Sequence, residues 1–311
     1  MRLGTVLYDS RERVVADLGA GRMLDLHLAA EKAGMNAAHF VDMLAVIYGG
    51  EEALAEARAL LEDVHDSDVL LEDEVVFCPP IFPVQYRDCL VFEEHLVNAF
   101  KQAEKMTGRP FTIPKVWYTQ PIYYKGNRMS FVGHKADVHW PSYAEFLDIE
   151  LELAVIIGKK GRDISQSDAP AHIFGYSILN DISARDAQMA EMPGQLGPAK
   201  GKDFDTGNVL GPWITTADDI PHPAALDMEA RVNGERWGGG NSAQMHHDFA
   251  RIIEHISASE TLYPGEVIGS GTVGTGCGLE IGKRLVDGDR FELTIEKIGT
   301  LANRIVKQSE S

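Results

Sequence analysis

Cysteine is scarce in this chain, and its scarcity excludes two kinds of architecture. Among 311 residues only three are cysteines, Cys78, Cys89 and Cys277. They are too few and too widely spaced for a disulfide framework or for a zinc site built from Cys-x-x-Cys pairs. We therefore expect a protein of a reducing compartment, the cytoplasm.

Positive charge is also scarce. The chain has 29 lysines and arginines against 47 aspartates and glutamates, which gives a formal net charge of −18. The resulting field repels phosphate backbones and anionic membrane surfaces, so we expect neither nucleic acid nor a membrane as a partner. An organic acid as substrate would need local cations or a bound metal to reverse this field in its pocket.

Long apolar runs and nucleotide-binding motifs are missing as well. No run approaches the roughly 20 apolar residues that span a bilayer, and residues 1–4 lack the start of the apolar core, about 7–15 residues long, of a signal peptide. The glycine-rich stretch 265–280 holds no GxxxxGK[ST], and no GxGxxG that would follow a strand and open a helix. We interpret these glycines as the floor of a cleft, where the backbone approaches a ligand closely.

The overall composition is that of an ordinary globular protein, with 44% hydrophobic and 24% charged residues. Residues 1–75 carry no catalytic constellation and are predicted to form a small N-terminal domain. A proline-rich segment at 78–83 leads into a predicted catalytic domain over 76–311. This second part shows many short strands and few helices, with a tight hairpin at Asn233-Gly234, and this pattern predicts an α+β fold built on mixed, rolled β-sheets.

An alternating segment at 147–158 carries three carboxylates in a row. Its odd positions are branched apolar residues, and its even positions begin with Asp148, Glu150 and Glu152. The period of two predicts a strand with one core face and one acidic face. Two interpretations stay open. The acidic face is either solvated, or it binds a divalent cation with Glu150 and Glu152 as oxygen ligands for Mg²⁺, Mn²⁺ or Ca²⁺.

A helical pattern at 87–100 places Asp88 and His95 on one face, because they are seven positions apart. They are either an acid near a helix N-terminus and a surface histidine, or a ligating carboxylate and a general base that face one cleft. Both interpretations stay open from these residues alone.

A second polar segment, 180–188, follows an apolar run. Ser183 with Asp186 resembles a capping box, which places Asp181 at a strand-to-helix junction, where ligands often lie. The alternative is a helix cap with no further role. Lys202, in the loop that follows, is either an exposed lysine or a positive charge for an anionic substrate.

Six motifs, in order along residues 80–306, together resemble the fumarylacetoacetate hydrolase family. They are Asp88 with His95, Tyr-Lys-Gly at 124–126, Asp-Ile-Glu-Leu-Glu at 148–152, Asn-Asp-Ile-Ser-Ala-Arg-Asp-Ala-Gln at 180–188, Gly-Lys-Asp-Phe at 201–204, and Gly-Ser-Gly-Thr followed by Leu-Glu within 269–280. The resemblance implies the mixed, rolled β-sheet of that family's catalytic domain, a small-molecule organic acid as substrate, and a homodimer.

The resemblance also assigns roles to residues. It implies a cation, Mg²⁺, Mn²⁺ or Ca²⁺, held by Asp88, Glu150, Glu152 and Asp181. It implies His95 as general base with Glu280 as its orienting partner, and Arg185, Gln188 and Lys202 around a developing oxyanion. Tyr124 and Thr272 match positions that contact substrate.

The function expected first is a metal-dependent hydrolase that cleaves a C–C bond in a 1,3-dicarbonyl acid, such as an acylpyruvate or fumarylacetoacetate. A lyase, decarboxylase or hydratase acting on a 2-oxo acid such as oxaloacetate is the alternative, because the fold alone does not fix the reaction. A non-catalytic protein that binds a small acid is the third, although a binder needs neither a base nor its orienting partner.

Overall fold

The computed structural model describes residues 1–220 and 222–307, which form an α+β protein with three sheets. The largest sheet contains, in sheet order, β4 (Val69–Leu71), β3 (Arg22–Asp25), β2 (Arg11–Gly19), β1 (Arg2–Tyr8), β14 (Asn208–Thr216), β12 (Ile173–Asp181), β11 (Leu151–Ile157), β17 (Val267–Gly269), β6 (Tyr86–Cys89) and β7 (Tyr123–Lys125). Two further strands join it, since β5 (Val76–Phe77) pairs with β1 and β8 (Phe131–Val132) pairs with β14. The predicted fold class is confirmed.

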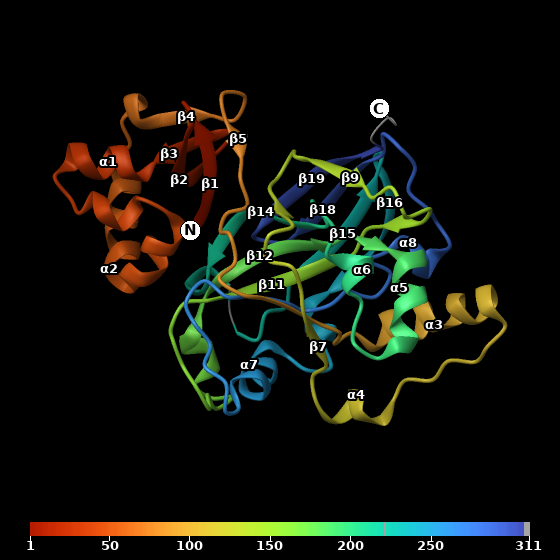
Figure 1. Ribbon diagram of the computed structural model, residues 1–311. Coiled ribbons are helices and arrows are strands. Elements are labelled where there is room, and N and C mark those ends of the chain that lie inside the picture. The colour runs from red at the N-terminus through yellow and green to blue at the C-terminus, as the bar shows by residue number, and fades with distance from the viewer. Residues whose placement is uncertain (221, 308–311) are drawn as a thin grey trace.

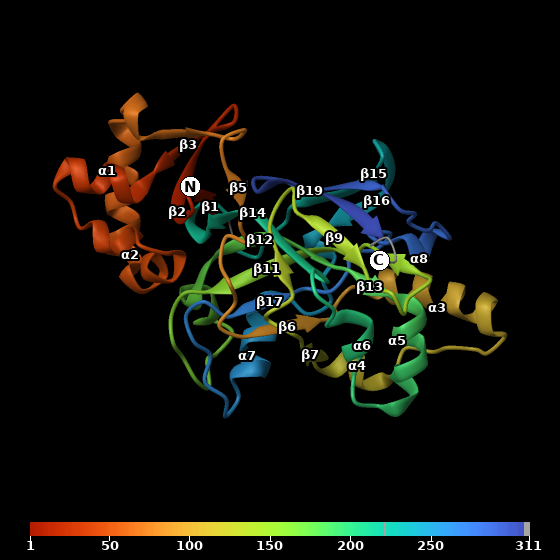
Figure 2. The same ribbon diagram turned by 45° about the horizontal axis from the view of Figure 1, so that its top comes forward.

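The N-terminal strands continue the sheet of the rest of the chain, because β1 pairs antiparallel with β14. Figures 1 and 2 show these strands and the helices α1 (Leu26–Ala33) and α2 (Met43–Glu62) at one side of the molecule. The predicted domain boundary after residue 75 stays a prediction, as does the homodimer.

A five-stranded sheet packs against the large sheet. It contains, in order, β16 (Glu235–Asn241), β15 (Asp227–Val232), β18 (Arg290–Ile295), β19 (Gly299–Lys307) and β9 (Asp137–Trp140). β15 and β16 form the predicted hairpin, whose turn residues Asn233 and Gly234 have φ of 51° and 78°. Positive φ at both turn positions is what a tight hairpin of this twist requires.

β11 is buried on both faces, so the solvated face considered for the segment 147–158 is wrong. Leu153 and Val155 belong to the core shared with β18 and β19, whereas Ala154 and Ile156 belong to the core shared with α1 and α2. The segment is also interrupted, because β10 (Leu147–Asp148) pairs with β13 (Ser183–Ala184) in a separate two-stranded sheet. The carboxylates of Asp148, Glu150 and Glu152 therefore lie inside the protein.

Two local predictions are wrong. Asp88 lies in strand β6, and the helix that carries His95 begins only at Glu93, because residues 86–89 pair with both β17 and β7. Ser183 and Asp186 form no capping box, because the helix that starts at Arg185 has Ala184 as its N-cap without a side-chain bond. Asp186 instead accepts a hydrogen bond from the backbone N–H of Glu145.

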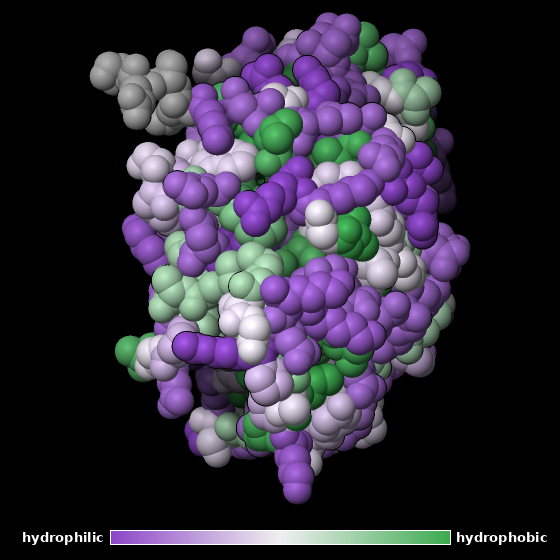
Figure 3. Space-filling view, turned by 90° about the vertical axis from the view of Figure 1, so that its right-hand side faces the viewer, coloured by the Kyte–Doolittle hydropathy of each residue, from purple (hydrophilic) through white to green (hydrophobic). Residues whose placement is uncertain are grey.

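The remaining helices are α3 (Glu93–Thr107), α4 (Lys115–Thr119), α5 (Arg185–Glu191), α6 (Ala199–Lys202), α7 (Phe249–Ser257) and α8 (Gly278–Ile281). Short 3₁₀ turns are η1 (Ala37–Phe40), η2 (Asp66–Asp68), η3 (Ala169–His172), η4 (Met192–Gly194), η5 (Ala217–Asp219) and η6 (Ser242–Gln244). Figure 3 views the molecule from the side of α3, α5 and α8 and shows a mainly hydrophilic face with scattered hydrophobic side chains. None of the helices in the described residues is both long enough and apolar enough for a membrane span.

Candidate active site

The acidic residues meet because four neighbouring strands of the large sheet converge at one edge. β12, β11, β17 and β6 are consecutive, with β11 antiparallel to β12 and β17, and β6 parallel to β17. The beginning of β11 therefore lies beside the ends of the other three strands. Glu152 lies at the beginning of β11, while Asp88 and Asp181 lie at the ends of β6 and β12.

Asp88, Glu152 and Asp181 form a buried acidic triad, in which one carboxylate oxygen of each lies within 4.8 Å of the others. The Gly271 N–H donates to Glu152 Oε2 at 3.1 Å and to Asp88 Oδ1 at 3.3 Å. Within the described part of the chain, Glu152 Oε1 and Asp181 Oδ1 are buried without a hydrogen-bond partner. A Cβ at position 269 would lie 2.7 Å from Glu152 Oε2 and closer still to Asp88 Oδ1, so Gly269 is needed there.

The triad has the chemistry of a cation site. Burial, and then the charge of a neighbouring carboxylate, raises the pKa of Asp88 and of Glu152 well above the ordinary carboxyl range. Burial is also the first cause that raises the pKa of Asp181. Because a divalent cation supplies compensating charge and prefers carboxylate oxygens with free lone pairs, these residues fit Mg²⁺, Mn²⁺ or Ca²⁺.

Glu150, the fourth predicted ligand, lies in a buried ion-pair network beside the triad. Its Oε2 pairs with Lys202 Nζ at 2.5 Å, and its Oε1 pairs with Arg185 Nη1 at 2.6 Å. Lys202 Nζ also pairs with Asp181 Oδ2 at 2.5 Å, which connects this network to the triad. Burial alone would raise the pKa of Glu150, but Arg185 and Lys202 outweigh burial and lower it. Its role as a direct metal ligand stays a prediction.

The predicted oxyanion group is brought together around Glu150. Arg185 Nη1 donates to Gln188 Oε1 at 3.1 Å, one turn further along α5. Arg185 Nε and Nη2 both donate to Asp148 Oδ2, at 3.0 and 2.9 Å. Lys202 completes the group, and both cationic side chains are buried. Their contact with a reacting oxygen stays a prediction.

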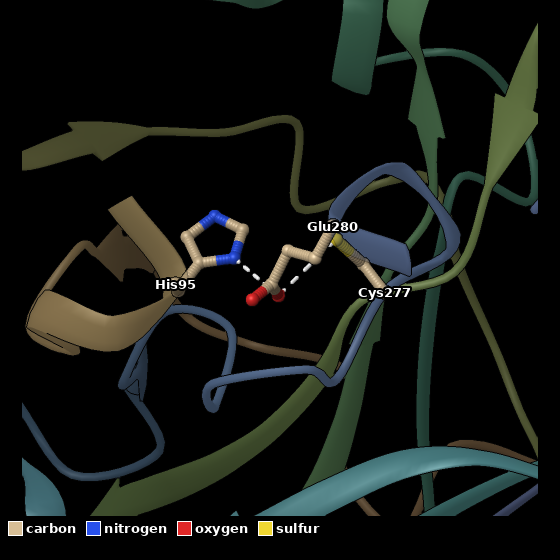
Figure 4. Close-up of side chains that lie close together, drawn as sticks. All are labelled: His95, Cys277 and Glu280. Atoms are coloured by element: carbon tan, nitrogen blue, oxygen red, sulfur yellow. Dashed lines mark hydrogen bonds and ion pairs between the residues drawn. The ribbon is translucent and has the colours of Figure 1, made fainter. Parts of the chain in front are cut away.

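His95 and Glu280 form the predicted pair, from the segments α3 and α8 that are far apart in the sequence (Figure 4). Glu280 Oε1 lies 2.8 Å from His95 Nδ1. Glu280 Oε2 accepts hydrogen bonds from Asn98 Nδ2 at 3.1 Å and from the Thr275 N–H at 2.7 Å. An ionised carboxylate only accepts, so His95 donates through Nδ1–H and keeps the lone pair on Nε2, the nitrogen on the far side of the ring in Figure 4.

The His95–Glu280 pair and the buried ion-pair network around Glu150 share one electrostatic environment. Burial, and then the charge of Asp148, raises the pKa of the Cys277 thiol well above its ordinary value, and Arg185 and Glu280 act on the same thiol. Cys277, the N-cap of α8, donates from Sγ to Glu280 Oε1 at 3.4 Å. The thiol of Cys277 therefore lies near both the His95–Glu280 pair and the buried charge network.

The two predicted substrate contacts lie at the margin of the triad. Tyr124 donates its hydroxyl hydrogen to Asp181 Oδ2 at 2.7 Å, and Thr272 is buried directly after Gly271. The ring of Tyr86 meets that of Tyr124 edge to face, with centroids 6.2 Å apart. Contact of Tyr124 and Thr272 with substrate stays a prediction.

Several residues of the site were not singled out by sequence reasoning. Tyr86 lies two positions before Asp88 on β6, and Asn98 lies three positions after His95 on α3, so strand and helix periodicity are the signals that point to them. Gly269 belongs to the glycine stretch that the sequence analysis interpreted as a cleft floor, but no local pattern shows why glycine is needed there, because the need arises from carboxylates on two other strands.

Several known proteins are similar to this chain over most of its length. The family model described as Fumarylacetoacetate (FAA) hydrolase C-terminal matches residues 90–306. The human mitochondrial oxaloacetate tautomerase FAHD2A is 34% identical over 258 residues, which cover 83% of this chain and 77% of that protein.

Two solved structures share the architecture over nearly the whole chain. The fumarylacetoacetate hydrolase of Exiguobacterium antarcticum has a TM-score of 0.76 at 29% identity and covers 99% of this chain and 100% of its own. The maleylpyruvate hydrolase of Sphingobium sp. SYK-6 has a TM-score of 0.75 at 25% identity with the same coverage of both chains. These matches and the order of the site residues show that the chain belongs to the fumarylacetoacetate hydrolase family of enzymes.

Proposed function

We propose that this chain catalyses proton transfer on a small 2-oxo dicarboxylic acid, with the keto–enol tautomerisation of oxaloacetate as its reaction. The observation that carries the proposal is the buried His95–Glu280 pair, which leaves the Nε2 lone pair as a proton acceptor. Tautomerisation needs only a base that removes a proton from carbon and returns it to oxygen, together with groups that stabilise the enolate.

In this reaction His95 Nε2 accepts a proton from C3 of the keto acid, the C2–C3 double bond forms, and an electron pair moves onto the 2-oxo oxygen. The imidazolium then gives the proton to that oxygen, so the enol has the same atoms and charge as the ketone. The buried cations Arg185 and Lys202 would stabilise the enolate. When bound, a divalent cation would act as a Lewis acid toward the 2-oxo group.

The name of the human relative supports this choice of substrate, since it is an oxaloacetate tautomerase and matches most of the chain. Oxaloacetate is also the 2-oxo acid considered in the sequence analysis for the alternative activity. The reaction differs from the lyase and hydratase chemistry considered there, because no carbon–carbon bond breaks and no water is added.

C–C bond hydrolysis, expected first from the sequence, is the second candidate. Here His95 would accept a proton from water and the hydroxide oxygen would bond to the remote carbonyl carbon. The C–C bond would then break with its electron pair left on the departing carbon, and the imidazolium would protonate that carbon, so that a carboxylic acid and a 2-oxo acid result. The two solved relatives named as hydrolases favour it. Both reactions use the same base, and they differ in whether water is consumed.

A substrate panel with product identification tests the proposal. Oxaloacetate, an acylpyruvate and fumarylacetoacetate are each incubated with the protein and Mg²⁺ or Mn²⁺, and NMR follows enol, ketone and cleavage products. We expect faster keto–enol interconversion of oxaloacetate, reduced by roughly 10²–10⁴-fold in His95→Ala because the base is lost. The matched control is His134→Ala, a buried histidine whose ring accepts a hydrogen bond from the Ala302 N–H.

Three outcomes would contradict the proposed function. Cleavage of an acylpyruvate without any effect on oxaloacetate would favour the hydrolase. An unchanged rate of tautomerisation in His95→Ala would remove the base from the reaction. Stabilisation of the protein by an organic acid without any product would indicate a non-catalytic binder.

A further inference from the structure

Asp148 is a fully buried carboxylate whose oxygens are all engaged by the protein. At the end of β10, its Oδ2 accepts from Arg185 Nε and Nη2 and from the Leu279 N–H, the last at 2.9 Å. Its Oδ1 accepts from the Gly278 N–H at 2.7 Å. Since both oxygens accept from the protein and the side chain is fully buried, Asp148 is not solvated, and its charge is already paired with the Arg185 guanidinium.

These contacts join two parts of the site that come from distant segments. Arg185 is the cation that also pairs with Glu150, and Gly278 and Leu279 are the first residues of α8. The next residue of α8 is Glu280, which holds His95. One carboxylate therefore connects the predicted oxyanion group to the partner of the base.

The approach between Asp148 and α8 is unusually close. A Cβ at position 278 would lie 2.6 Å from Asp148 Oδ1 and 2.8 Å from the ring of Trp237, so Gly278 permits the contact. A buried carboxylate is unfavourable unless it is paired and hydrogen-bonded. The burial of Asp148 raises its pKa, and the Arg185 guanidinium opposes that rise.

We propose that Asp148 is a positioning residue, which fixes the distance between the Arg185 guanidinium and the Glu280–His95 pair. This inference rests on the proposed function for its effect on turnover, although the positioning itself is a property of the fold. Asp148 touches none of the triad carboxylates through a hydrogen bond in the described residues. Its loss should therefore affect the chemical step more than metal or substrate binding.

Asp148→Asn is the test variant, because asparagine keeps the shape but replaces one acceptor oxygen with a donor. With Mn²⁺ and oxaloacetate, we expect kcat to fall about tenfold or more, since misplaced groups lose transition-state stabilisation. KM and the Kd for Mn²⁺ should change by less than about threefold, because the contacts that bind substrate equally in the ground state and in the transition state remain. In a double-mutant cycle, Asp148→Asn should add little to the loss in Glu280→Gln, since both act through His95.

A readout independent of turnover is the reaction of Cys277 with a thiol reagent, followed peptide by peptide. Cys277 is buried at the start of α8, so loosening this helix should increase its labelling rate about tenfold or more. The matched control is Asp25→Asn. Asp25 is also buried, pairs with Arg13 and accepts from the Leu28 N–H at the start of α1. The Asp25→Asn variant should be less stable than the wild type but should have the same kcat and the same rate of Cys277 labelling.

The outcomes separate the two proposals. A folded Asp148→Asn variant with wild-type kcat and wild-type labelling would overturn the inference, as would a loss of kcat matched by an equal loss of Mn²⁺ affinity. If the wild type turns over no acid of the panel, the proposed function fails, and Cys277 labelling alone decides the inference. If Asp148→Asn does not fold, Asp148→Ser takes its place. Failure of both to fold would mean that Asp148 is required for folding, and would also overturn the inference.

Discussion

Replacing Glu152 by glutamine removes one charge from the acidic triad and should make the metal-free protein more stable. At the 4.8 Å that bounds the separations in the triad, two ionised carboxylates repel by about 3 kcal/mol at an effective dielectric constant near 20. Protonation limits this cost, because holding a glutamic acid protonated at about pH 7 costs roughly 4 kcal/mol. We therefore expect Glu152→Gln to raise the free energy of unfolding by about 3 kcal/mol in EDTA.

Excess Mn²⁺ should make the wild type more stable than Glu152→Gln. A cation that binds only the folded wild type stabilises it by about 4.1 kcal/mol at a concentration of about 1,000 times Kd, which exceeds the difference of about 3 kcal/mol expected in EDTA. Glu152→Gln, which lacks one ligand, should gain little. Urea unfolding followed by tryptophan fluorescence, with EDTA and with Mn²⁺, measures both effects.

Glu266→Gln is the matched control for this prediction. Glu266 is buried like Glu152, but it pairs with the Arg87 guanidinium. Its replacement should destabilise the protein by roughly 3–5 kcal/mol with or without metal, since it leaves Arg87 without this partner. A Glu152→Gln variant that is less stable than the wild type in EDTA, or that keeps the full stabilisation by Mn²⁺, would contradict the repulsion and the cation site described above.

Three further predictions follow from the site. Glu280→Gln should lower kcat by roughly 10²-fold or more in steady-state assays, since glutamine lacks the negative charge that stabilises protonated His95 and keeps one acceptor oxygen where Glu280 uses two; an unchanged kcat contradicts the role of the pair. Gly269→Ala should abolish Mn²⁺ binding by calorimetry, because its Cβ would occupy the space of Asp88 and Glu152; wild-type affinity contradicts the predicted crowding. Because the pKa values of Asp88 and Glu152 are raised on folding, their contribution to metal-free stability should be present below about pH 4 and lost at higher pH. The difference in unfolding free energy between Glu152→Gln and wild type should therefore grow with pH in EDTA, and a shrinking difference contradicts this sign.

Much of the fold could be predicted from local patterns. The alternation at 147–158 identified β11 and its core face, and Asn233-Gly234 identified the hairpin between β15 and β16. The burial of the acidic face could not be predicted in this way, since it depends on packing by β6, β12 and β17 from other parts of the chain. Periodicity also misassigned Asp88, because the pairing of β6 with β17 overrides the helical pattern of the sequence.

The site, like the fold, could be predicted only in part. His95 and Glu280 lie as the resemblance implies, and three of the four predicted ligands form the triad. The contacts of Asp148 could not be predicted, because its partners are a side chain of α5 and two backbone N–H groups of α8 that no sequence spacing relates. Their proximity is a product of tertiary structure.

The rate at which C3 of oxaloacetate exchanges hydrogen for deuterium in D₂O, measured by NMR, tests the roles of the acidic triad and of His95 most directly. The wild type with Mn²⁺ should accelerate this exchange, and EDTA, Glu152→Gln and His95→Ala should each abolish the acceleration. Acceleration that persists with EDTA or in His95→Ala would contradict the roles given to the acidic triad and to His95.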